Sequence, residues 1–98
     1  MQHLKTLAGN GWLRTRDAGS VQGRYQIVIS RRMTGPERGQ LATRGSLTSE
    51  PWALVVARVD GSAVLILETG EALDIRLTGL ALTDGDANFV VAGKMPAL

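Results

Sequence analysis

The chain has 98 residues, of which 44% are hydrophobic and 20% are charged, and its formal net charge is +2. This composition excludes a disordered chain, and the length suffices for one hydrophobic core, so we expect a single β-rich domain over residues 1–98. The absence of cysteine and the single histidine, His3, exclude disulfides, thiolate catalysis and a typical zinc site, so we expect no metal and no cofactor.

The first half of the chain predicts three strands. The first is expected near residues 12–16 and the second at 24–31, where Tyr25, Ile27 and Ile29 alternate with polar residues as on a half-buried strand. A loop over Met33–Gly39 separates the second strand from a third at 40–48.

Residues 49–59 fit two structures. Apolar residues from Trp52 to Val59 recur at helical spacing, and Pro51 suits the start of a helix. The β-branched content favours a strand instead, and the following Asp60-Gly61 dipeptide suits a type I′ hairpin turn. We therefore expect a strand here, with a helix as the alternative.

The remaining sequence predicts an antiparallel meander from about residue 52 to residue 92. Turns are expected at Gly70-Glu71 and Asp84-Gly85, and Ala72–Thr78 alternates as a strand with one face in water. We therefore expect an all-β fold, which is a small barrel or sandwich of six to eight short antiparallel strands, partly open, with Greek-key or meander topology.

Three segments, at 52–59, 63–67 and 89–92, carry apolar residues on both faces of the predicted strands. A strand in a small barrel normally has one face on the core, so the second apolar face needs a cover. That cover is either a second copy of the chain or a terminal segment such as Met1–Leu7. The candidate residues for self-association are Trp52, Leu54, Val56, Val64 and Ile66.

The two halves of the chain carry opposite charge. Residues 1–49 hold eight basic and two acidic residues, whereas residues 50–98 hold three basic and seven acidic ones. Either strands from both halves neighbour each other and mix their charges on the surface, or the first half forms a basic face that binds an anion.

Alternation places Trp12, Arg14 and Arg16 on one strand face, although Trp12 also fits the edge of a core. An exposed indole stacks on nucleic-acid bases and arginines hold phosphates, which is how OB-type barrels bind single strands. The candidate anion-binding or nucleic-acid-binding residues are Trp12, Arg14, Arg16, Arg24, Arg31, Arg32 and Arg44.

No catalytic motif stands out in the sequence. The only imidazole is near the N-terminus, and neither a G-x-S-x-G turn nor a phosphate-binding loop is present. We expect no enzyme, with a site built from Asp, Glu, Arg and Tyr alone as the remaining catalytic option.

We therefore expect a non-catalytic binding or assembly module that self-associates, with a single-stranded nucleic-acid-binding OB-like barrel as the alternative. The N-terminus lacks the apolar stretch of a signal peptide, and no apolar run is long enough to span a bilayer. A cytoplasmic location with no membrane partner is the corresponding expectation.

Overall fold

The computed structural model describes residues 2–16, 19–36, 38–81 and 83–93. Six strands form a closed barrel in the order β1-β2-β3-β6-β5-β4, and all neighbouring strands are antiparallel. The predicted all-β class is confirmed, and the architecture is a barrel rather than a sandwich. Its closure with six strands corrects the expectation of a partly open barrel and differs from the five-stranded OB-fold.

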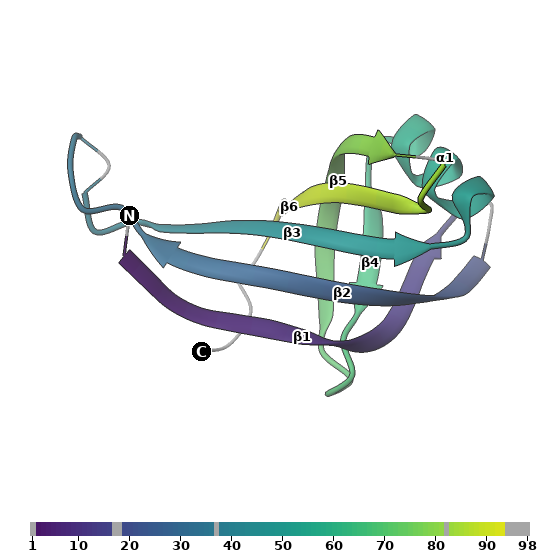
Figure 1. Ribbon diagram of the computed structural model, residues 1–98, viewed down its shortest axis with the longest axis horizontal. Coiled ribbons are helices and arrows are strands. Elements are labelled where there is room, and N and C mark those ends of the chain that lie inside the picture. Colours follow the sequence, from purple (N-terminus) through teal and green to yellow (C-terminus); the bar gives the residue numbers. More distant parts are fainter. Residues whose placement is uncertain (1, 17–18, 37, 82, 94–98) are drawn as a thin grey trace.

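The barrel consists of two three-stranded meanders. Strands β1 (Gln2–Thr15), β2 (Gly19–Arg31) and β3 (Leu41–Ser49) form the N-terminal meander, and β4 (Ala63–Ile66), β5 (Ala72–Ala81) and β6 (Asp86–Val91) form the C-terminal one. Helix α1 (Pro51–Asp60) connects the two. In Figure 1 the long strands β1, β2 and β3 run side by side and extend beyond the barrel, whereas α1 lies at the opposite end.

Strand β1 is much longer than the predicted segment at 12–16, because it spans fourteen residues. Two inward positions of this strand are glycines, which interrupt the apolar alternation. A Cβ at Gly11 would overlap the carbonyl oxygen of Ile66, and a Cβ at Gly9 would lie 3.0 Å from the Tyr25 hydroxyl. Close neighbours therefore fill these positions. Residues 2–7 pair with β2, so they form part of a strand rather than a covering segment.

Residues 51–60 form a helix, so the strand expected at 49–59 is wrong. Pro51 lies in the first turn, where its missing N–H has no consequence, and Gly61 ends the helix with a left-handed φ of 83°. A type I′ turn at Asp60-Gly61 would need positive φ at both residues, but among the described residues only glycines have one. The predicted hairpin there is therefore also wrong.

The helix covers one end of the barrel. Its buried side chains are Ala53, Leu54 and Ala57, which follow the helical period and face the barrel. The apolar residues on its other side, including Val55 and Val59, are exposed. Helical rather than extended backbone therefore explains why apolar residues fall on both sides of a predicted strand.

The other predicted turns are confirmed. Gly70, with a φ of 94°, lies in the turn between β4 and β5, where the Leu67 N–H donates to the Glu71 carbonyl at 2.8 Å. Gly85, with a φ of 68°, lies in the turn between β5 and β6. The loop after β2 is closed by a hydrogen bond of 2.9 Å from the Arg32 N–H to the Gln40 carbonyl.

Side chains from alternate strand positions point into the barrel and form its core. Tyr25, Ile27 and Ile29 of β2 all face inward, as their alternation predicts. The largest side chains that are almost completely buried are Phe89, Leu13, Ile27, Ile29, Leu47, Leu54, Leu65 and Ile75. Because the core takes the odd-numbered residues of β1, β2 and β3, the even-numbered residues point outward.

Candidate functional site

The charge asymmetry of the sequence follows the two meanders. The described strands β1, β2 and β3 contain no aspartate or glutamate, and their basic residues are Lys5, Arg14, Arg24, Arg31 and Arg44. Within the part of the chain that the structure describes, the meanders pair along two short seams, Trp12–Arg14 with Val64–Ile66 and Gly45–Thr48 with Asp86–Phe89. The strands of the two halves therefore do not interleave, and the N-terminal meander forms a continuous sheet without carboxylates.

Three arginines and one tryptophan of the predicted set share the outer face of this sheet. Trp12 and Arg14 lie on β1, Arg24 lies on β2 and Arg44 on β3, and all four side chains are exposed. In the register, Arg24 is opposite Asn10 on one side and Thr48 on the other. Strand geometry places the Cα atoms of Arg24 and Arg44 about 14 Å apart, and those of Trp12 and Arg24 about 8 Å apart.

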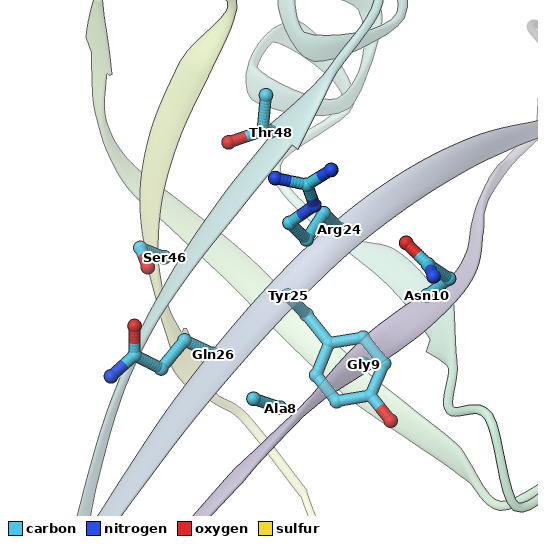
Figure 2. Close-up of a pocket in the computed structure, with 8 residues that line it drawn as sticks. All are labelled: Ala8, Gly9, Asn10, Arg24, Tyr25, Gln26, Ser46 and Thr48. Carbon is cyan, nitrogen blue, oxygen red and sulfur yellow. The ribbon is translucent and has the colours of Figure 1, made fainter.

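A shallow hollow of about 390 Å³ lies on this face beside Arg24. Figure 2 shows that Arg24 extends from β2 toward Thr48 of β3, and that Gln26 extends toward β3 near Ser46. The small residues Ala8 and Gly9 of β1 leave the space open on the other side. Apart from the arginine, the polar side chains that line the hollow are neutral: Asn10, Tyr25, Gln26, Ser46 and Thr48.

The arginines on this face have no carboxylate partner among the described residues. Arg14, Arg24 and Arg44 form no ion pair with any residue that the structure describes. The carboxylate in the same cross-strand row as Arg24 is Asp86 of β6, which accepts a hydrogen bond of 2.6 Å from the Thr48 hydroxyl. The guanidinium of Arg24 is thus available to an anionic group from outside.

Trp12 lies at the edge of this basic face. Its side chain is 47% exposed, and the residue is opposite Gln22 on β2 and Ile66 on β4. Arg14 follows it on the same face of the strand, and Arg24 is its diagonal neighbour across β1 and β2. An indole that is half accessible offers a flat surface on which an aromatic ring can stack. The neighbouring arginines suit a ligand that also carries a negative charge.

The other predicted anion-binding residues lie elsewhere. Arg16 follows the end of β1 and lines, with Arg14, a second hollow of about 420 Å³ that also contains Asp60 and Asp74. Arg31 has the odd strand position and points to the opposite side from Arg24. Arg32 is half-buried at the start of the β2–β3 loop, where its backbone carbonyl accepts from the Gly39 N–H at 2.7 Å.

The predicted self-association residues are also divided. Leu54 is fully buried in the core, whereas Trp52 on the same helix is 53% exposed and Val56 is half-buried. Val64 and Ile66 are half-buried on the outer face of β4, next to Arg14 and Trp12 of β1. These five residues therefore do not form one surface.

Sequence reasoning missed the neutral part of the candidate site. Asn10, Gln26, Ser46 and Thr48 have the same strand parity as the arginines, so alternation alone placed them on the outer face. Their proximity depends on the register between β1, β2 and β3, which the sequence does not specify.

The structure offers little for metal chemistry. Within the described residues no three His, Cys, Asp or Glu side chains form a group that could hold a metal ion. The His3 ring forms a hydrogen bond of 2.7 Å with the Thr6 hydroxyl at the far end of β1. No described helix has the length and apolar character needed to span a membrane.

No protein-family model matches the sequence, and comparisons with curated proteins and with solved structures give no significant match. We therefore infer the function from the geometry and chemistry of the described residues.

Proposed function

We propose that the protein is a non-catalytic binding module that holds single-stranded nucleic acid on the outer face of the N-terminal meander. The observation that carries this proposal is the position of Arg24 and Arg44, unpaired among the described residues, on one carboxylate-free sheet face with the exposed Trp12. Arginines bind phosphates, and stacking on an aromatic ring contributes about 1–3 kcal/mol per base.

The neutral residues of the hollow fit the same ligand. The amides of Asn10 and Gln26 and the hydroxyls of Ser46 and Thr48 offer both donors and acceptors to base edges and sugar hydroxyls. A duplex presents its bases inside the stack, so a ring at the position of Trp12 can stack only on an unpaired base. The combination therefore favours a single strand over a duplex.

The test compares two arginines of the same strand that point to opposite sides. Fluorescence anisotropy of a labelled single-stranded oligonucleotide at about 50 mM salt should show binding that Arg24→Ala weakens by about eightfold, the counterion-release value for one phosphate contact. Arg31→Ala, which removes the same charge from the other side of β2, should change the affinity little.

Three results would contradict the proposal. These are the absence of oligonucleotide binding, equal losses from the two variants, and tighter binding of a duplex of the same length. An oligosaccharide that binds at Trp12 with little salt dependence would identify a carbohydrate-binding face instead, because a neutral ligand releases no counterions.

A second function, self-association, is favoured by the outward side of α1. Trp52, Val55 and Val59 are 53%, 38% and 79% exposed, and they follow one another at helical spacing away from the barrel. Burial of these side chains against a second copy would give a dimer at micromolar concentration in light scattering. Val59→Lys should then restore a monomer, and a wild-type protein of 10.4 kDa in solution would refute self-association.

A further inference from the structure

The hollow beside Arg24 continues across the barrel into the C-terminal meander. A neighbouring depression of about 530 Å³ shares Gln26 and Ser46 with it and is also lined by Arg44, Asn88 and Thr78. Asn88 belongs to β6 and Thr78 to β5, so the depression crosses the seam between the two halves of the barrel. Its lining is partly apolar, because Phe89 and Val90 contribute to it.

A further arginine lies next to this depression, opposite one of the residues that line it. Arg76 of β5 is opposite Val90 of β6, and Val90 follows Phe89, which is opposite Gly45 of β3. Arg44 and Arg76 are therefore at about the same level with one strand between them, which corresponds to a Cα separation of about 10 Å. Arg76 is exposed and forms no ion pair with a described residue.

We infer that the bound single strand crosses the sheet diagonally from Trp12 through Arg24 and Arg44 to Arg76, which is a further phosphate-binding residue. This inference rests on the proposed nucleic-acid-binding function. From Trp12 to Arg44 the path covers about 22 Å, and Arg76 extends it by about 10 Å. Such a path is compatible with the lower part of the range of about 4–16 nucleotides that barrel modules occupy.

Carboxylates set the direction and the end of the path. Asp86 lines another depression, with Leu80 and Ala81, and so lies to one side of the route through Arg44. Beyond Arg76, on the same outer face of β5, Asp74 lines the hollow that also contains Asp60. A polyanion that follows the arginines therefore avoids Asp86 and stops before Asp74.

The experiment pairs Arg76→Ala with Arg58→Ala, which removes another exposed arginine, on α1 and away from the path. Binding is measured by anisotropy at about 50 mM salt with oligothymidylates of about 3 and about 10 nucleotides. Arg76→Ala should weaken binding of the longer probe by about eightfold and leave the shorter probe, held at Trp12 and Arg24, unchanged. Arg58→Ala should affect neither probe.

The possible outcomes separate the path from the function. If Arg24→Ala weakens the longer probe but Arg76→Ala does not, the path is wrong and the proposed function stands. If Arg76→Ala and Arg58→Ala weaken it equally, Arg76 acts only through net charge and the path is also wrong. If neither probe binds the wild-type protein, the proposed function fails and the path fails with it.

Discussion

Simultaneous replacement of Arg24 and Arg44 by alanine should weaken the binding of a single-stranded oligonucleotide. It should also remove most of the salt dependence of the affinity that comes from the N-terminal meander. For a single strand, affinity scales with salt concentration to the power of about −0.7 per phosphate contact. One contact is therefore worth about eightfold at about 50 mM salt and about threefold at about 200 mM. The double variant should bind about 60-fold more weakly at the lower salt and about 10-fold more weakly at the higher.

The assay is an anisotropy titration at several salt concentrations between these limits. The plot of log affinity against log salt should be less steep by about 1.4 in the double variant than in the wild type. The control is Arg31→Ala with Arg58→Ala, which changes the net charge equally but removes arginines that lie off the proposed face. Equal loss of slope in the control would refute the reasoning, because net charge rather than a defined face would then determine binding.

Two predictions concern the packing that supports this face. Gly45→Ala should destabilise the protein by about 1–2 kcal/mol in urea unfolding, because a Cβ there would overlap the buried Phe89 ring. Gly79→Ala, whose Cβ would lie 3.7 Å from the Asn88 side-chain nitrogen, should cost nothing measurable, and equal costs would contradict the packing argument. Tyr25→Phe removes the hydroxyl that accepts a 3.0 Å hydrogen bond from the Glu68 N–H, so it should lower the free energy of unfolding by about 1 kcal/mol. An unchanged unfolding midpoint for Tyr25→Phe would show that this bond does not stabilise the β4–β5 turn.

The strands with alternating core residues were predictable from the sequence, because a period of two can be recognised without knowing which strands pair with each other. Strand β2 illustrates this, since Tyr25, Ile27 and Ile29 fill the barrel interior. The first part of β1 was not predictable, because its inward positions at Gly9 and Gly11 are occupied by groups from elsewhere in the chain. Long-range packing, rather than local composition, determines strand structure there.

Helix α1 shows a different limit of sequence interpretation. Its buried face consists of Ala53, Leu54 and Ala57, whereas its more conspicuous residues, Trp52 and Val59, are exposed. The helical spacing of the apolar residues was visible, but in so short a run it was outweighed by the β-branched content and the following Asp60-Gly61 dipeptide. The predicted self-association residues were chosen on the assumption that this segment is a strand. This explains why they include Leu54, which the helix buries in the core.

The candidate site was predictable in part. Alternation correctly placed Trp12, Arg14, Arg24 and Arg44 on exposed strand positions, and the counts of charged residues identified the charge asymmetry between the halves of the chain. It did not reveal that the C-terminal residue Arg76 shares the outer face with Arg44. That juxtaposition depends on the β3–β6 and β5–β6 registers, which are tertiary features.

The most direct test of the proposed function uses each tryptophan in turn as the only reporter. In Trp52→Phe the remaining indole is Trp12 on the proposed face, and in Trp12→Phe it is Trp52 on α1. Titration with a single-stranded oligonucleotide at about 50 mM salt should quench Trp12 saturably, and the quenching should weaken steeply at about 200 mM. Trp52 fluorescence should change little. Saturable quenching of Trp52 with an unchanged Trp12 signal would contradict the account, because the ligand would then bind at the helix.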